Sequence, residues 1–357
     1  MFKQTLYILQ NPFRKAFSGL NFCIFGGMLY FYGRKMFKTM KKVLLLSFTA
    51  LALFAGCKKA NTGGNGGGGE QGDVYVPATA ATLNVNAELE MTHEETIQIT
   101  VNLTPVNATP TIEWESSDPS IFFISDVSDD KATATVYGNM AGSAYVICKV
   151  SNDEGEPLKP STHIRVFPKG VDMGDGTIWA TANFGAISEN ETGYYIAWGE
   201  TQQKTNYSLA TTDESQIYKW WNGSNWTKYQ SAGQPTLEGT DDAVLVNLGT
   251  SLKRWQTPTV LDFNNLINHS NITDAGGGKL KFTSIVQGYE GNSIVLPKCG
   301  IVEGPITVKR SVFAYWANSL STNPDNANAL LTDSNYNPEL GTWKRNCGMA
   351  IRPVLHK

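Results

Sequence analysis

The chain has 357 residues, of which 41% are apolar, with 29 Lys and Arg against 32 Asp and Glu. This length is enough for two ordinary domains, the apolar content is too high for a disordered protein, and the sequence pI of about 5.9 argues against a nucleic-acid-binding protein. Residues 1–56 hold 8 basic residues and no acidic one, which leaves 21 basic and 32 acidic residues, a formal charge of −11, over the 301 residues that follow. A basic, apolar head before an acidic body indicates export.

The head of the chain contains the parts of a signal peptide. Lys41 and Lys42 precede an apolar run over Val43–Ala55, which is shorter than the ~18–20 residues that cross a bilayer as a helix. The sequence Leu53-Phe54-Ala55-Gly56-Cys57 then resembles the bacterial lipobox. The resemblance implies that residues 36–56 are a lipoprotein signal peptide and that the thiol of Cys57 carries lipid, which attaches the protein to a membrane. A buried helix that ends in a free thiol is the alternative.

The flanking segments follow from this assignment. A signal peptide begins close to its basic residues, so we expect translation to start at Met36 or Met40, and residues 1–35 to be an overlong gene prediction. Residues 57–74 are rich in glycine and are expected to form a lipidated, flexible tether. The lipobox resemblance implies an outer-membrane lipoprotein at the cell surface. The periplasmic face stays open, because lysines follow Cys57 where acidic residues favour surface export in lipoproteins of this kind.

Residues 75–168 have the pattern of short β-strands. Apolar and polar residues alternate over Ile97–Leu103, and shorter alternating runs follow around Val136, Ile147 and Val166. Turn residues such as Pro, Gly and Asp separate these runs. Strands of this length and spacing, over about 95 residues, predict an all-β sandwich.

This segment resembles the group 2 bacterial Ig-like domain. The resemblance implies that Trp114 lies in the core between the two sheets and that the domain acts as a spacer, since such domains often separate a functional domain from the cell surface. The motifs that carry it are Pro105-Val106-Asn107-Ala108, Trp114-Glu115-Ser116-Ser117-Asp118-Pro119 and Ala141-Gly142-Ser143-Ala144-Tyr145-Val146.

Residues 171–357 show little helical periodicity. The clearest predicted helix covers Leu261–Asn268, where apolar residues share one face and Thr259 is a suitable N-cap. A shorter helix is predicted over Asp241–Leu248, because acidic residues at its start suit the helix dipole. The rest is predicted to form short strands and long polar loops.

This second segment resembles the Fibrobacter-type major paralogous domain, which is related to the DUF1566-type and C-type-lectin-like folds. The landmarks occur in the expected order. They are Val171-Asp172-Met173-Gly174, Trp179–Ala186, Gly193-Tyr194-Tyr195, Ala197–Thr201, Tyr218-Lys219-Trp220, Asp241-Asp242-Ala243, Trp255–Thr259, Ile294–Pro297, Tyr315–Ser319 and Ile351-Arg352-Pro353-Val354.

The resemblance implies an α+β, C-type-lectin-like fold with two helices around a small twisted sheet. It also implies that most landmark residues are structural. Trp179, Trp198, Trp255 and Trp316 are expected to be buried, each with its indole N–H in a hydrogen bond. Arg352, between apolar neighbours, is expected to be buried against backbone carbonyls or in a charge pair.

The sequence contains no convincing catalytic constellation. It lacks the nucleophile-elbow, zinc-protease and phosphate-loop motifs. We therefore predict no enzymatic activity, no catalytic residues, no cofactor and no metal site. The oxygen-rich loop Asn323–Asn328 lacks the residue pairs that hold calcium and sugar in C-type lectins, and it is interpreted as a polar loop.

Cys299 and Cys347 are the two cysteines of the second segment. In an exported protein they could form a disulfide, but we favour two free, buried thiols. The related formylglycine-generating enzymes need a pair of reactive cysteines, but these two lack that active-site context.

The best binding candidate is an aromatic segment with five aromatic residues among its twelve residues, 218–229. An Asn-Gly pair at its centre predicts a hairpin turn. We favour packing of these aromatic side chains inside the domain. The alternative is that the exposed face of an indole stacks on a sugar, with asparagine side chains bonding its hydroxyls. The candidate ligand-binding residues are Tyr218, Trp220, Trp221, Asn222, Asn225, Trp226 and Tyr229.

The order of lipobox, tether, spacer and loop-rich domain predicts a non-enzymatic cell-envelope lipoprotein that presents a lectin-like domain. Its expected partners are the membrane, through lipid on Cys57, and a glycan or a surface protein, with no role in nucleic-acid binding. A structural or assembly component of the envelope or of a surface appendage is the alternative.

Overall fold

The computed structural model describes residues 21–25, 28–32, 74–230, 235–307, 309–332 and 337–357. The chain divides into two compact units, residues 1–70 and 71–357. In the first unit, β1 (Asn21–Phe25) pairs antiparallel with β2 (Met28–Tyr32). The predicted signal peptide, the predicted lipidation site Cys57 and the predicted tether up to residue 73 lie outside the described residues. None of the helices in the described ranges has the length and apolar character that a membrane crossing requires.

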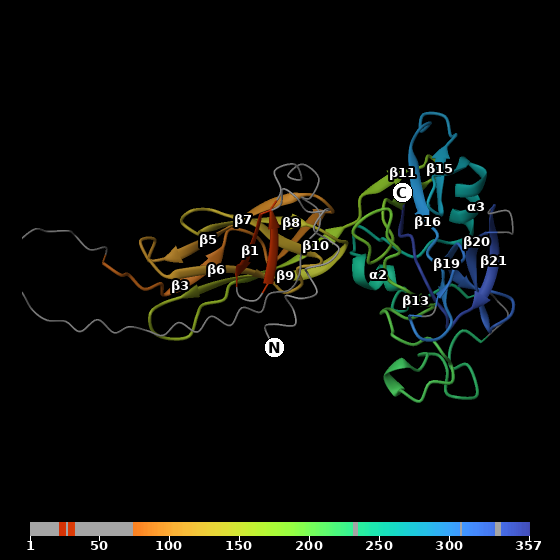
Figure 1. The fold of residues 1–357 in the computed structure, drawn as a ribbon, viewed down its shortest axis with the longest axis horizontal. Helices are drawn as coiled ribbons and strands as arrows, with labels where there is room; N and C mark the ends of the chain where they lie inside the picture. The colour runs from red at the N-terminus through yellow and green to blue at the C-terminus, as the bar shows by residue number, and fades with distance from the viewer. Residues whose placement is uncertain (1–20, 26–27, 33–73, 231–234, 308, 333–336) are drawn as a thin grey trace, which may run out of the picture. The chain divides into compact units, whose positions relative to one another are not determined.

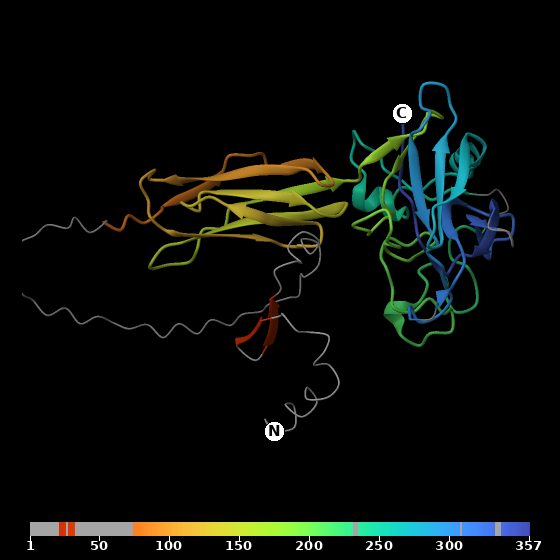
Figure 2. The ribbon, with the colours of Figure 1, turned by 45° about the horizontal axis from the view of Figure 1, so that its top comes forward.

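Residues 80–167 form two four-stranded sheets, as the alternating pattern predicted (Figures 1 and 2). One sheet has the order β3-β5-β8-β7 and the other β4-β10-β9-β6, with β4 parallel to β10. Residues of both sheets, among them Ile99, Val136, Val146 and Ile164, meet in one buried cluster. The strands are β3 (Ala80–Leu83), β4 (Glu88–Thr92), β5 (Thr96–Thr104), β6 (Thr111–Ser116), β7 (Phe122–Val127), β8 (Thr133–Gly138), β9 (Gly142–Ser151) and β10 (Ser161–Phe167).

Trp114, on β6, was predicted to lie in the core of this sandwich. It packs against both buried clusters of the sandwich, but its side chain is only half-buried. Its indole N–H donates to the carbonyl of Lys131 at 2.9 Å. This hydrogen bond satisfies the polar end of the ring at the turn between β7 and β8.

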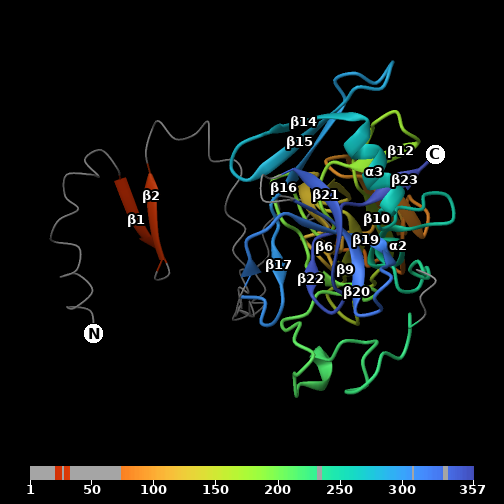
Figure 3. The same cartoon turned by 90° about the vertical axis from the view of Figure 1, so that its right-hand side faces the viewer.

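Residues 170–357 form four small sheets. Side chains from these sheets meet in two buried clusters. The sheet orders are β11-β12-β23, β13-β22-β17-β18, β14-β15-β16 and β19-β20-β21. Figure 3 shows β14 and β15 side by side and close to α3, which contacts both. The strands are β11 (Gly170–Asp172), β12 (Thr177–Ala180), β13 (Ile196–Ala197), β14 (Ser270–Asp274), β15 (Lys279–Ser284), β16 (Ser293–Pro297), β17 (Ile301–Val302), β18 (Lys309–Arg310), β19 (Ala314–Leu320), β20 (Asn326–Thr332), β21 (Pro338–Lys344), β22 (Gly348–Met349) and β23 (Val354–His356).

Both predicted helices are present, and α3 begins at its expected N-cap, Thr259. In α3 (Val260–Asn268), Thr259 and Asp262 form a reciprocal capping box. In α2 (Ala243–Leu248), the carboxylate of Asp242 accepts the backbone N–H groups of the first turn. A 3₁₀ turn, η2 (Glu214–Gln216), lies in the long connection between β13 and α2.

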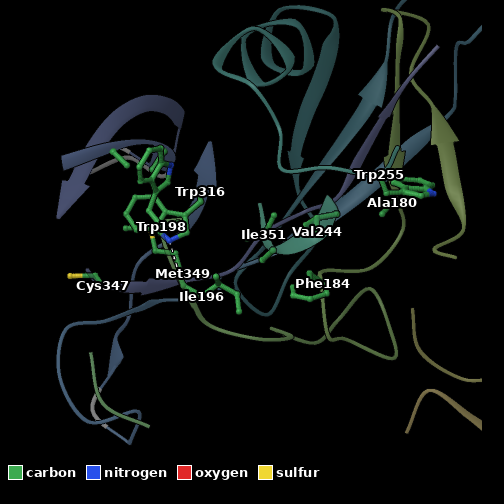
Figure 4. Packing of buried hydrophobic residues seen from close by; sticks show 14 of the residues in the cluster. Ala180, Phe184, Ile196, Trp198, Val244, Trp255, Trp316, Cys347, Met349 and Ile351 are labelled. Atoms are coloured by element: carbon green, nitrogen blue, oxygen red, sulfur yellow. Dashed lines mark hydrogen bonds between the residues drawn. The ribbon is translucent and has the colours of Figure 1, made fainter. Parts of the chain in front are cut away.

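The four tryptophans expected in the core are all buried. Trp198 and Trp316 lie close together in one cluster (Figure 4). Trp198 donates its indole N–H to the carbonyl of Ala317 at 3.0 Å, and Trp316 donates to that of Ile196 at 2.8 Å. Trp179 differs from the prediction, because its indole N–H is buried with no partner in the described part of the chain.

Arg352 is fully buried, as predicted. Its guanidinium donates to the carbonyl oxygens of Ala180 at 3.0 Å and Val295 at 2.8 Å. Burial lowers the pKa of this guanidinium. Two backbone carbonyls from separate strands are thereby joined through one cation, which is a structural role.

Candidate functional site

The aromatic segment forms a short hairpin, as its Asn-Gly pair predicted. Trp221 and Trp226 face each other through an isolated antiparallel bridge. Between them, the side-chain oxygen of Asn222 accepts the backbone N–H groups of Ser224 at 3.1 Å and Asn225 at 2.7 Å. Gly223 has a φ of 93°, a conformation that glycine adopts without steric cost. We call residues 221–226 the tryptophan hairpin.

The tyrosines at the two ends of the segment, Tyr218 and Tyr229, are buried, as the packing interpretation expects, and they are not exposed for ligand contact. The hydroxyl of Tyr218 donates to the carbonyl of Trp198 at 2.5 Å, and that of Tyr229 donates to Asp241 at 2.6 Å. Burial raises the pKa of Tyr218 well above its ordinary value. Burial, with the hydrogen bond to Asp241, raises the pKa of Tyr229 to about 12. Both side chains therefore fix the base of the segment as neutral hydrogen-bond donors.

Trp220 is also engaged by the protein itself. Its indole N–H donates to the carbonyl of Gly199 at 2.9 Å. The ammonium groups of Lys219 and Lys228 lie 4.3 and 5.0 Å from its ring centroid, within the range of cation–π attraction. Tyr229 meets the same ring edge to face, with centroids 5.8 Å apart. Trp220 was a candidate ligand-binding residue, but its ring is surrounded by other residues of the protein.

A buried carboxylate organises the charges at this base. Asp241 is 2% exposed and accepts from Lys219 at 2.9 Å and from Lys228 at 2.5 Å. Burial alone would raise the pKa of Asp241, but the hydrogen bonds from Lys228, Tyr229 and Lys219 together lower it below its ordinary value. The carboxylate therefore stays charged and joins both ends of the segment to the start of α2.

The tryptophan hairpin packs on two residues that lie about a hundred positions later in the chain. The indole N–H of Trp226 donates to the carboxylate of Asp325 at 2.7 Å. The guanidinium carbon of Arg345 lies 4.0 Å from the ring centroid of Trp226. Arg345 is itself fully buried and donates to the carbonyls of Tyr229 at 2.9 Å and Lys228 at 3.1 Å. Its planar cation thus joins the segment and stacks on the ring.

No sequence pattern marks Arg345 or Asp325 as part of this site. Neither residue stands in a motif, and each is far from the hairpin in sequence. Asp325 lies in the oxygen-rich loop that was interpreted as merely polar, and it shapes the site through its hydrogen bond to Trp226. Only the folded arrangement brings the two residues to the hairpin.

The outer part of the hairpin is open to solvent. Trp221 and Trp226 are half-buried, with ring centroids 4.6 Å apart, and Asn222 and Asn225 are exposed. The side-chain oxygen of Asn222 is used in the turn, whereas the carboxamide of Asn225 has no partner among the described residues. The predicted ligand-binding set is therefore reduced to two indoles with a carboxamide beside them.

Cys299 and Cys347 do not form a disulfide; each is a reduced, buried thiol. They lie in different core clusters. The sulfur of Cys299 is 3.1 Å from the hydroxyl of Tyr315 and 3.2 Å from the side-chain amide of Asn183. Burial raises the pKa of this thiol, which disfavours the reactive thiolate.

The described part of the chain contains no group of three or more His, Cys, Asp or Glu side chains arranged to hold a metal ion.

Comparisons with known proteins do not identify a family. No family model matches the chain, and no curated protein matches it. Among solved structures, a crystal structure of a DUF4784 family protein from Bacteroides caccae matches over 76% of this chain and 85% of its own. The sequence identity is 10% and the TM-score is 0.18, so this likeness carries no argument about fold or function.

Proposed function

We propose that the chain is a non-enzymatic cell-envelope lipoprotein whose second domain, of the α+β C-type-lectin-like kind, binds a glycan through the tryptophan hairpin. The observation that supports this is the pair of half-exposed indoles of Trp221 and Trp226, placed beside the exposed carboxamide of Asn225. Sugar rings have apolar C–H faces and polar edges. A site with an aromatic surface and an adjacent hydrogen-bonding group complements both features.

The contacts below the hairpin favour binding, because they hold the rings in place before a ligand arrives. Asp325 fixes the indole N–H of Trp226, and Arg345 packs on its ring. Trp221 in turn packs on Trp226. Fewer side-chain rotamers are then lost on binding, and each immobilised side chain would otherwise cost about 0.5–1.5 kcal/mol of affinity.

The envelope location and the absence of catalysis are supported by the sequence. The lipobox at Leu53–Cys57 and the glycine-rich residues that follow it suit a protein held at a membrane by a flexible tether. The sequence contains none of the catalytic motifs considered above. Binding is therefore the activity that the exposed groups of the second domain support best.

The test is binding of the full-length protein, purified in detergent, to a glycan array, followed by titration with the best glycan found. We expect Trp221→Ala to weaken that affinity at least about tenfold, and Asn225→Ala about three- to tenfold. Tyr145→Ala is the matched control, since Tyr145 is an aromatic residue with 51% exposure on the first domain; it should leave the affinity unchanged.

Two outcomes would contradict the proposal. One is an unchanged glycan affinity in both hairpin variants. The other is an array with no binding, together with reproducible capture of one protein partner, which would favour the assembly role over glycan recognition.

A further inference from the structure

A cleft of about 640 Å³ lies on the second domain, beside the β14–β15 hairpin. Its apolar lining comes from Ile267 on α3, Ile272 on β14, Leu280 on β15 and Phe313 just before β19. The start of β21, at Pro338, forms part of the remaining lining. None of the lining residues belongs to the tryptophan hairpin, so the cleft is a separate surface.

The edge strand β14 contributes to the lining of the cleft. β14 is the outer strand of the sheet β14-β15-β16, and Ile272, Thr273 and Asp274 line the cleft. No further strand of this sheet pairs with the other side of β14 (Figure 3). The direction of its backbone groups therefore decides what the edge offers to a ligand.

The hydrogen-bond register gives that direction. Just beyond the two ends of β14, the N–H of Ala275 donates to the carbonyl of Lys279, and the N–H of Ile285 donates to that of His269, both at 2.9 Å. In an antiparallel pair, bonded and non-bonded residues alternate, so the odd-numbered residues of β14 bond to β15. The backbone groups of Ile272 and Asp274 consequently point away from β15, and neither residue makes a backbone hydrogen bond on that side within the described residues.

We propose that this cleft binds an extended peptide segment of a partner protein, which adds to the outer edge of β14 as a further strand. The N–H and C=O groups of Ile272 and Asp274 would pair with the peptide backbone. Alternate side chains of the peptide would then reach the apolar lining around Ile267 and Phe313, because side chains alternate along a strand.

The charged residues that line the cleft indicate which side chains the peptide should carry. Lys279 and Lys298 line the cleft, against Asp274. The ammonium group of Lys279 lies 2.7 Å from the neutral side-chain oxygen of Asn190, a contact that leaves its charge uncompensated. The ammonium group of Lys279 therefore favours a peptide segment with acidic residues between apolar ones.

The β14 edge lacks the usual protection of a free strand edge. Such edges are commonly blocked by proline, by a bulge or by an inward-pointing charge. β14 has the sequence Ser-Asn-Ile-Thr-Asp with no proline, and its pairing with β15 is regular along all five residues. The charge of Asp274 stands only at its last position, so the stretch at Ile272 stays available.

The experiment measures binding of the full-length protein to the peptide Val-Glu-Val-Thr-Val by fluorescence anisotropy. Two N-methylated forms are compared, one methylated at the second and fourth residues and the other at the first, third and fifth. In an added strand only one of these sets faces β14. One form should lose at least about tenfold in affinity, and the other should bind within about twofold of the parent.

Three further measurements locate the site. Lys279→Gln should weaken the glutamate peptide about two- to fivefold and should strengthen a Val-Lys-Val-Thr-Val peptide slightly, because it removes a like charge. Lys281→Gln, on the same strand but outside the cleft lining, is the control and should change neither. Bound peptide should slow hydrogen exchange at the amides of Ile272 and Asp274.

The proposal is overturned if no peptide binds at millimolar concentration, if both N-methylated forms bind like the parent, or if both lose binding equally. It is independent of the glycan proposal. Trp221→Ala should therefore bind the peptide as the unmodified protein does, and equal loss of peptide and glycan binding in that variant would contradict a separate site.

Discussion

Asp241 shows how a single residue holds the base of the candidate site. Its buried carboxylate receives hydrogen bonds from Lys219, Lys228 and Tyr229, which lie on both sides of the tryptophan hairpin. A buried charge that loses its partners is costly, and so are cations that lose their carboxylate. The position of the hairpin therefore depends on a residue outside it.

Asp241→Asn should lower the free energy of unfolding by about 1–3 kcal/mol at neutral pH, because the two lysines lose their counter-charge. The pKa of Asp241 is below its ordinary value of 3.8 in the folded protein. Its stabilising contribution is therefore complete above that value and is lost as the pH falls through the folded pKa. The difference between the variant and the unmodified protein should accordingly shrink below about pH 3.8.

Urea unfolding at pH 7 and at pH 3, followed by tryptophan fluorescence, measures this difference. Eight of the nine tryptophans lie in residues 171–357, so the signal reports mainly on this part of the chain. Glu238→Gln is the control, since Glu238 pairs with Lys228 at an exposed position and should change stability by less than about 1 kcal/mol. An equal effect of both substitutions, or a difference that does not depend on pH, would argue against this role for Asp241.

At the scale of elements, the sequence was most informative where local chemistry decides the structure. Thr259 marked the start of α3, and the acidic pair Asp241-Asp242 marked the start of α2. In both helices a side-chain oxygen at the start accepts backbone N–H groups. The alternation in Ile97–Leu103 predicted strand β5, and Asn222-Gly223 predicted the turn of the hairpin. In each case the signal lies within a few residues of its structural consequence.

Features that depend on distant parts of the chain could not be predicted in this way. Trp226 and Arg345 are more than a hundred residues apart, and only the folded second domain brings them together. The burial of Tyr218 also depends on a distant acceptor, the carbonyl of Trp198. The aromatic pattern identified the right segment, but it could not tell which rings face solvent.

Thr259→Ala should destabilise the second domain by about 1 kcal/mol, since it removes one half of the capping box of α3. Leu261→Ala in the first turn of the same helix is the matched control. The side chain of Leu261 is 65% exposed, so its loss should stay within about 0.5 kcal/mol. The same urea unfolding assay compares the two, and a larger loss for Leu261→Ala would show that the cap contributes little to this helix.

At the scale of the whole molecule, the proposed function requires attachment to a membrane. We predicted lipid on Cys57 from the lipobox at Leu53–Cys57. One acyl chain gives only marginal, reversible membrane binding, whereas two or three chains give stable attachment, at about 0.8 kcal/mol for each buried CH₂ group. The thiol of Cys57 is the group to which this chemistry would add the lipid, and serine at the same position offers no thiol.

Cys57→Ser, expressed in a bacterium with an outer membrane, should therefore incorporate no labelled palmitate and should leave the membrane fraction. Cys148→Ser is the control, because Cys148 is a buried thiol inside the first domain; that variant should keep both the label and the membrane location. Retention of label by the Cys57→Ser protein would place the lipid elsewhere. An unlabelled protein that still sediments with membranes would show that protein contacts provide the attachment, which would favour the assembly role over a tethered glycan-binding domain.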